Sequence, residues 1–252
     1  MSAEKHSPLD QFKIEPIFPA QVGGYDISFS NSSLFMFVAI AAITLFLVLG
    51  MKKRAMVPGR WQSLAEISYE FVAGMIKENI GAEGRKFFPF IFTLFMFILF
   101  CNLLGMVPYT FTVTSHIAVT LALALLVFLT VIIVGVVKHG VHFLHLFIPS
   151  GIPGWLAPII FVIEIVSFLA RPVSLSLRLA VSMMAGHVLL KVMAGFVIGL
   201  GTATIAVGGV GGVLPLLFIS GLIGLEIFVA FLQAFIFALL TTIYLNDALN
   251  LH

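Results

Sequence analysis

The stretch EIVSFLARPVSLSLRLAVSMMAGHVLLK, residues 164–191, places charged side chains inside a long apolar segment. Its charged or titratable residues are Glu164, Arg171, Arg178, His187 and Lys191. One charged side chain at the centre of a bilayer costs about 2.5–3.5 kcal/mol by the lowest estimates. Because charges inside membrane segments are kept mainly where they act, we expect this stretch to carry the functional site.

The spacing of these residues predicts two polar faces on one helix. Glu164, Arg171 and Arg178 follow one another at intervals of seven residues. Seven residues fall about 20° short of two helical turns, so the three side chains share one slowly drifting face. Ser174 joins that face, four residues before Arg178. His187 lies nine residues beyond Arg178, about half a turn round the helix, and points elsewhere.

Arg171 and Lys191 have a second interpretation. A long cationic side chain near a helix end can bury its stem and hold its charge at the membrane surface. The sequence leaves both residues open between this structural role and a role in function. Arg178 has apolar sequence on both sides, which favours a role in function.

The composition of the whole chain predicts an all-α polytopic membrane protein. Of its 252 residues, 61% are hydrophobic and only 10% are charged, and the mean hydropathy is +1.17. Soluble domains carry about 25% charged residues. The formal net charge of +2 is too small to indicate a nucleic-acid partner. The single cysteine, Cys101, provides neither a disulfide framework nor a cysteine metal motif.

Five apolar segments are long enough to cross a bilayer, which requires about 20 helical residues. They cover residues 33–51, 87–108, 116–137, 156–199 and 213–248. We expect them to form a single membrane domain, residues 33–252. The polar residues 1–32, which contain several prolines, are predicted to form an extramembrane N-terminal tail.

The last two segments are too long for upright spans. As one helix, residues 156–199 would be about 66 Å long, against a hydrocarbon core of about 30 Å. Either this segment breaks into two spans, with Pro172 as its one clear interruption, or it lies steeply tilted across the membrane. We expect the Gly-rich residues 199–212 to turn the chain, so that two long, tilted helices pack as a hairpin.

Residues 59–79 differ from the spans in their alternation of apolar and polar positions. Trp61, Leu64, Ile67 and Phe71 recur at near-helical spacing, with charged and polar residues between them. This pattern is typical of an amphipathic helix that lies on the membrane surface. A helix packed on a soluble partner would show the same pattern.

Three histidines follow the third span. His139, His142 and His145 invite a metal or haem interpretation because of their regular spacing. No carboxylate partner lies nearby in the sequence, so we favour a hydrated loop at the membrane face and expect no metal.

The distribution of Lys and Arg in the loops predicts the orientation. Residues 52–86 contain seven of them, the loop that begins at 138 contains one, and the loops 109–115 and 199–212 contain none. The N-terminus is therefore expected outside. The loops with basic residues and, after five crossings, the C-terminus are expected in the cytoplasm.

The polar residues of the two long segments suggest proton movement. Glu226, Gln233 and Tyr244 share one face of the last segment, because their spacings of seven and 18 residues approach two and five full turns. Glu226 and His187 can exchange protons with water. An arginine stays charged at any physiological pH, so Arg178 can only attract or block a charge.

The acid nearest to Arg178 on its predicted face lies far away. Glu164 is about 21 Å distant along the helix axis. We therefore expect Arg178 to face an acidic group on another protein.

Three stretches of the chain resemble subunit a of the F-type ATP synthase family. LARPVSLSLRLAVSMMAGH, residues 169–187, resembles the family's signature, and FLQAFIFALLTTIYLNDAL, residues 231–249, resembles its last helix. FFPFIFTLFMFILFCNLLGMVPYTFTVTSH, residues 87–116, resembles its second span and the loop that follows. The resemblance covers nearly the whole chain in the right order.

The resemblance implies a stator subunit beside a rotating ring of c subunits, with two offset half-channels for protons. It places the family's essential arginine at Arg178. It also assigns residues to the half-channels: His187, Glu226, Gln233 and Ser182 to the outer one, and Glu164 and Ser174 to the cytoplasmic one. It leaves the roles of Arg171, Lys191 and Tyr244 open.

The resemblance also implies the surroundings of the chain. Its expected partners are the c-ring, b-type peripheral stalk subunits, the lipid bilayer and the rest of the synthase. We expect it to be multi-pass in a bacterial inner (plasma) membrane, to be non-catalytic alone, and to need no cofactor.

The chain departs from the family pattern after Arg178, where many members read LFGN and this chain reads LAVS. Ser182 then keeps a hydroxyl where the family commonly has an amide, which weakens its assignment. A stand-alone proton-coupled secondary transporter is the alternative function, but such proteins often contain internal repeats, and none is visible here. A haem-binding redox subunit would require facing histidines at membrane depth.

Overall fold

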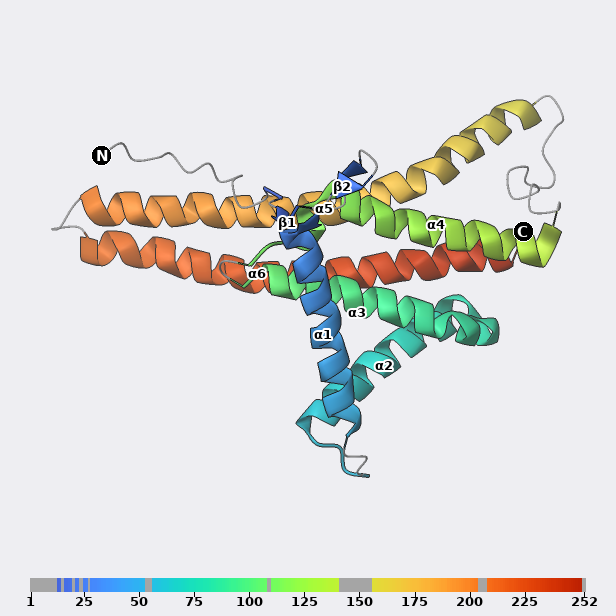
Figure 1. The fold of residues 1–252 in the computed structure, drawn as a ribbon, viewed down its shortest axis with the longest axis horizontal. Helices are drawn as coiled ribbons and strands as arrows, with labels where there is room; N and C mark the ends of the chain where they lie inside the picture. Colours follow the sequence, from blue (N-terminus) through green and yellow to red (C-terminus); the bar gives the residue numbers. More distant parts are fainter. Residues whose placement is uncertain are drawn as a thin grey trace.

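The computed structural model describes residues 13–14, 16–19, 21–22, 25–26, 28–52, 56–107, 110–140, 156–203 and 208–250 (Figure 1). Six α-helices account for most of them: α1 (Asn31–Met51), α2 (Arg60–Asn79), α3 (Phe88–Gly105), α4 (Ile117–His139), α5 (Ala157–Ala203) and α6 (Gly208–Leu249). Two 3-10 helices, η2 (Gly81–Phe87) and η3 (Val113–Ser115), precede α3 and α4. The prediction of an all-α polytopic protein is confirmed, because five helices are long and apolar enough to cross a membrane.

The hairpin of α5 and α6 dominates the molecule. At 47 and 42 residues, these helices are about 70 Å and 63 Å long. Figure 1 shows α6 lying alongside the second part of α5, and shows α1 running across the direction of both. Of the two alternatives for residues 156–199, the unbroken helix is therefore the one observed. A helix of this length fits the hydrocarbon core only when it is strongly tilted.

Pro172 lies inside α5 without ending it. Proline removes one intrahelical hydrogen bond and its ring presses on the preceding turn, which bends a helix. Figure 1 shows the first part of α5 diverging from the line of its second part. A proline inside the helix, such as Pro172, can account for this divergence without ending α5.

The Gly-rich turn predicted at residues 199–212 is wrong in its extent. Helix α5 continues to Ala203 and α6 already begins at Gly208, so residues 204–207 alone separate them, and these lie outside the described residues. Glycine costs a helix about 1 kcal/mol relative to alanine. In a lipid environment an unpaired backbone group costs more than that, which favours helix even in a Gly-rich segment.

Helix α2 occupies nearly the residues that were predicted for the amphipathic helix, but only part of its apolar face is buried. Val72 and Met75 are buried in the core, whereas Trp61, Leu64 and Ile67 remain exposed. Its second half therefore packs on the bundle, as Val72 does within the cluster that includes α3 side chains. Its first half presents an apolar surface of the kind that a bilayer covers.

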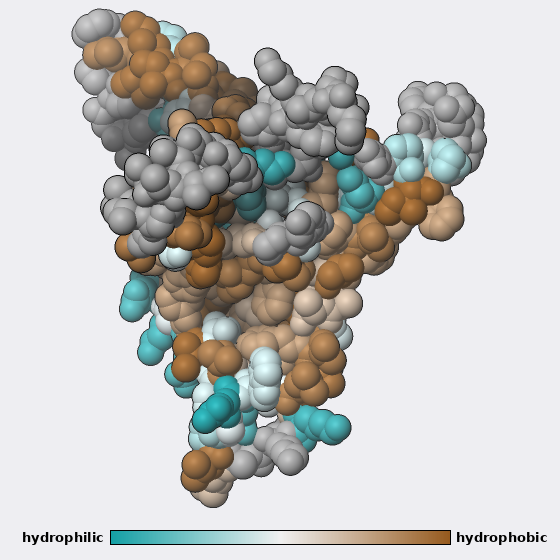
Figure 2. All heavy atoms as spheres, turned by 90° about the vertical axis from the view of Figure 1, so that its left-hand side faces the viewer, coloured by the Kyte–Doolittle hydropathy of each residue, from teal (hydrophilic) through white to brown (hydrophobic). Residues whose placement is uncertain are grey.

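The outer surface has the polarity of a membrane protein. Figure 2 shows hydrophobic atoms over much of the middle of the molecule and hydrophilic atoms at its lower end. Large apolar side chains such as Phe37, Leu45 and Leu129 are exposed on the spans. At the end where α1 meets α2, the basic residues Lys52 and Arg60 lie close together in the sequence.

Short strands precede α1, which the sequence did not predict. Strand β1 (Pro16–Phe18) pairs with β4 (Phe29–Ser30), and β2 (Gln21–Val22) pairs with β3 (Tyr25–Asp26), both antiparallel. The two-residue and three-residue lengths are too short for an alternating pattern to be visible in the sequence.

Candidate functional site

His187 and Glu226 meet between the two long helices. His187 Nδ1 on α5 lies 3.5 Å from Glu226 Oε1 on α6, and the two side chains are only 10% and 6% exposed. The neighbouring Gly186 permits this approach, since a Cβ atom there would lie 2.7 Å from Glu226 Oε1. The sequence predicted these residues for one path, and the fold brings them into contact.

The loop between α3 and α4 closes over the other side of the imidazole. Thr112, the residue before η3, places its Oγ1 3.0 Å from His187 Nε2. The same hydroxyl donates to the Gly105 carbonyl oxygen at 3.4 Å. No pattern in the sequence singles out Thr112, which is one of several hydroxyl residues in this loop.

A pocket of about 230 Å³ lies between α5 and α6 beside this contact. Its polar lining includes Ser182 and Glu226, and the rest is mainly Leu, Val, Ala and Met. Ser182 donates its hydroxyl to the Leu179 carbonyl oxygen at 3.1 Å, which leaves its lone pairs to accept. The pocket exceeds the ~30 Å³ share of one water molecule, so it has room for water beside the Glu226 side chain.

Several buried polar atoms near this region have no hydrogen-bond partner among the described residues. They are both carboxylate oxygens of Glu226, Asn102 Oδ1, Thr114 Oγ1 and His116 Nε2. Asn102 lies on α3, and its amide donates to the Ala230 carbonyl oxygen of α6 at 3.1 Å. Buried polar groups are normally satisfied by protein or by ordered water, so this region is suited to internal water.

His116 closes the same loop just before α4. Its ring stacks on Phe111 with centroids 4.9 Å apart. Burial lowers the pKa of His116 below its usual value, because the charged imidazolium is poorly solvated there. His116 is therefore neutral at pH 7 and adds no positive charge beside the site.

Arg178 lies on the opposite, open side of α5. Its side chain is exposed in a shallow groove that is otherwise lined by apolar residues and Ser174. No ion pair with Arg178 occurs among the described residues. An exposed guanidinium without an acidic partner in an apolar groove has the arrangement expected if another protein supplies the acid.

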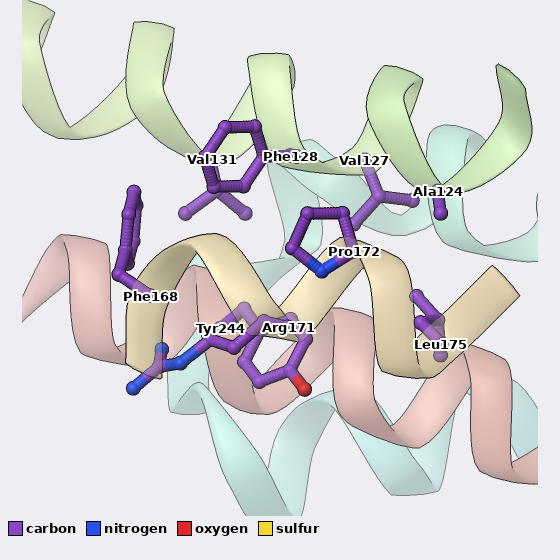
Figure 3. Close-up of a pocket in the computed structure, with 9 residues that line it drawn as sticks. All are labelled: Ala124, Val127, Phe128, Val131, Phe168, Arg171, Pro172, Leu175 and Tyr244. Atoms are coloured by element: carbon purple, nitrogen blue, oxygen red, sulfur yellow. The ribbon is translucent and has the colours of Figure 1, made fainter. Parts of the chain in front are cut away.

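Arg171 points to α6 instead, so the single stripe predicted for Glu164, Arg171 and Arg178 is wrong as a continuous surface. Arg171 Nη1 lies 3.1 Å from Asp247 Oδ2, and its guanidinium lies 4.9 Å from the centre of the Tyr244 ring. Figure 3 shows Arg171 beside Tyr244, with the next residue, Pro172, nearer to the side chains of α4. The bend at Pro172 and the length of the side chain allow Arg171 to leave the face of Arg178.

This ion pair gives Arg171 a contact within the hairpin. Its charge is paired with Asp247 and lies against the Tyr244 ring, which joins α5 to α6. Phe168 also faces the guanidinium, at 5.7 Å from its ring centre.

The remaining predicted residues are spread along the hairpin. Gln233 is half-buried on α6, about 10 Å along the axis from Glu226. Tyr244 belongs to the Arg171 cluster, about 27 Å along the axis from Glu226. Glu164 is half-buried in the first part of α5, and Lys191 is exposed one turn beyond His187.

The histidines after α4 are described only in part. His139 Nε2 lies 3.0 Å from the Leu249 carbonyl oxygen, which ties the end of α4 to the end of α6. Helix α4 stops there because Gly140 adopts φ +57° and donates to the Val136 carbonyl oxygen. His142 and His145 lie outside the described residues, and the part of the chain that is described holds no group of three metal-ligating side chains.

Comparison with known proteins identifies the family of this chain. The model of the ATP synthase A chain family matches residues 33–246. The chain is 58% identical to an ATP synthase subunit a from Rhizobium etli (strain CIAT 652), over 97% of this chain and 98% of that protein. It is 56% identical to one from Chelativorans sp. (strain BNC1), over 96% and 97%, and 51% identical to one from Paramagnetospirillum magneticum, over 98% and 99%. The chain therefore belongs to the ATP synthase A chain family.

Proposed function

We propose that His187 and Glu226 form the inner end of a proton path that leads from the outer side of the membrane to a rotor. As a member of its family, the chain is a membrane subunit of a bacterial ATP synthase and is not catalytic alone. The observation that carries the proposal is the buried contact between an imidazole and a carboxylate, beside a pocket large enough for water. Both groups can gain and lose a proton near physiological pH when their surroundings tune them.

Arg178 is the barrier in this proposal. An opposite charge within ~4–6 Å favours the ionised form of a carboxylate, so a rotor carboxylate that arrives beside Arg178 releases its proton. The guanidinium keeps its own proton and its positive charge repels protons, which prevents a direct leak. When the rotor covers the apolar groove around Arg178, water is excluded from it and both effects become stronger.

The two half-channels meet the rotor on either side of Arg178. Gln233 and Ser182 extend the outer path from Glu226 along the hairpin. Ser174, one turn from Arg178 in the same groove, and Glu164, farther along α5, line the cytoplasmic path. One proton that crosses 100 mV releases about 2.3 kcal/mol, so rotation must accumulate several steps before it drives ATP synthesis.

The rotor in this proposal is a ring of c subunits, each with one carboxylate at membrane depth. The exposed apolar side chains of α1 and of the first half of α2 are available to lipid and to b-type peripheral stalk subunits. The residues 1–32 lie outside the cytoplasm, and the C-terminus lies in the cytoplasm of a bacterium with this chain in its inner membrane. The Lys and Arg residues of 52–86 support this orientation.

Replacement of Arg178 tests the proposal. Arg178→Ala should abolish ATP-driven proton pumping in inverted membrane vesicles, while the synthase still assembles, because the side chain is exposed and makes no described ion pair. Lys138→Ala is the matched control, since it also removes an exposed cation. Lys138 lies on α4, outside the groove of Arg178, and pairs with Glu83. Full pumping by the Arg178→Ala complex would refute the proposed role of Arg178.

A further inference from the structure

Thr112 contacts the one ring nitrogen of His187 that faces away from Glu226. Its hydroxyl oxygen lies 3.0 Å from Nε2, whereas Nδ1 lies 3.5 Å from Glu226 Oε1. Thr112 is 5% exposed, so its hydroxyl has little access to bulk water. The imidazole is thus held between a hydroxyl from the α3–α4 loop and a carboxylate from α6.

The second contact of the hydroxyl, a long hydrogen bond, favours one direction for the first. A threonine hydroxyl has one hydrogen to donate and two lone pairs that accept. The Gly105 carbonyl oxygen can only accept, and it receives that hydrogen at 3.4 Å. A lone pair of Thr112 is then left for His187, and it can be used only when Nε2 carries a hydrogen.

The position of Thr112 is held tightly enough for this role. A Cβ atom on residue 105 would lie 2.8 Å from Thr112 Cγ2, so only glycine lets the threonine pack so close to the end of α3. The Ser115 hydroxyl donates to the Thr112 carbonyl oxygen at 2.7 Å and secures the same turn.

We propose that Thr112 is a positioning residue that keeps a hydrogen on Nε2 of His187, so that Nδ1 alone exchanges a proton with Glu226. In this step the proton leaves Nδ1 of the imidazolium and binds Glu226 Oε1. A neutral imidazole with its hydrogen on Nε2 and a neutral carboxylic acid remain. The inference rests on the proposed function of the His187–Glu226 pair.

The 3.5 Å separation suits a transient transfer. It is longer than a typical hydrogen bond, so a small rotation of the carboxylate or one bridging water completes the connection. The charged groups near His187 among the described residues are Glu226 on α6 and Lys191 on its own helix, while the loop presents the uncharged Thr112. The loop therefore orients the ring without adding a competing charge.

Removal of the hydroxyl tests the inference in the complete synthase. Thr112→Val keeps the shape of the side chain and removes the acceptor, so the imidazolium loses one charge-assisted hydrogen bond. ATP synthesis in inverted vesicles, at a fixed membrane potential and varied lumenal pH, should then reach half of its maximum about one pH unit lower. At a lumenal pH well above the wild-type midpoint, the rate should fall about tenfold.

Two further variants separate orientation from packing. Thr112→Ser keeps the hydroxyl and should restore the wild-type pH profile. Thr110→Val removes a hydroxyl of the same loop that bonds only to backbone in the described contacts, at Leu104 and Val107, and should leave the profile unchanged. A wild-type profile for Thr112→Val, or the same defect in Thr112→Ser, would overturn the inference.

A fourth variant separates this inference from the proposed function. Glu226→Gln should abolish synthesis in the same vesicles. If Glu226→Gln is inactive and Thr112→Val is normal, only the role of Thr112 fails. If Glu226→Gln is fully active, the proton path itself fails.

Discussion

Gly186 offers the sharpest test of the contact between the two long helices. In Gly186→Ala, the new Cβ atom would lie 2.7 Å from Glu226 Oε1 and 3.2 Å from its carboxyl carbon. The oxygen must move by about 0.7 Å before it reaches ordinary contact at 3.4 Å. Because Gly186 and His187 are neighbours on α5, a movement of this oxygen also alters its 3.5 Å contact with His187.

We expect Gly186→Ala to have a small effect on stability and a large effect on proton pumping. The atom that must yield is the end of a flexible side chain, so we expect a loss of stability below the ~1–3 kcal/mol that is usual for overpacking. A misplacement of about 1 Å in a reacting group can cost on the order of 100-fold in rate. For a shift of about 0.7 Å we therefore expect proton pumping to fall by about 10-fold to 100-fold.

Gly195→Ala is the matched control, because it adds the same methyl group to the same helix with no neighbouring atom within 4 Å. ATP-driven pumping in inverted vesicles measures function, and the thermal unfolding midpoint of the purified complex measures stability. Normal pumping by Gly186→Ala, with the complex assembled, would show that the close approach of Glu226 to α5 is not needed.

Two other predictions concern pairs of residues between α5 and α6. The exchange of His187→Glu with Glu226→His should be tolerated better than either single change, because the pair keeps one acid and one imidazole; an equal loss of pumping in all three variants would contradict this. Arg171→Ala should destabilise the assembled complex by about 1–2 kcal/mol, because it leaves Asp247 half-buried without its partner. The double variant with Asp247→Asn should lose less than the sum of the single losses in thermal unfolding, and strict additivity would argue against the pair.

The part of the fold that is local could be predicted from the sequence. Hydrophobic runs gave the five spans and the amphipathic pattern gave α2, because helix formation in a membrane depends on segment length and composition. The continuity of α5 could not be predicted in this way. Whether Pro172 breaks a helix or only bends it depends on the helices that pack around it, here α4 and α6.

The candidate site likewise has a part that could be predicted from the sequence and a part that could not. The spacing and the cost of intramembrane charge identified Arg178, and the motif suggested that His187 acts with Glu226. Their distance, the close approach at Gly186 and the contact with Thr112 depend on helices and a loop that are distant in the sequence, and no periodicity encodes how they pack.

The charged stretch of residues 164–191 shows most clearly what the sequence and the tertiary structure each determine. The sequence by itself determined that this helix carries several charges at membrane depth, because residue identity and helical spacing are local properties. Only the tertiary structure decided their separate surroundings. Arg171 is paired with Asp247, Arg178 is exposed in an open groove, and His187 is enclosed with Glu226, since each depends on which element packs against that side of α5.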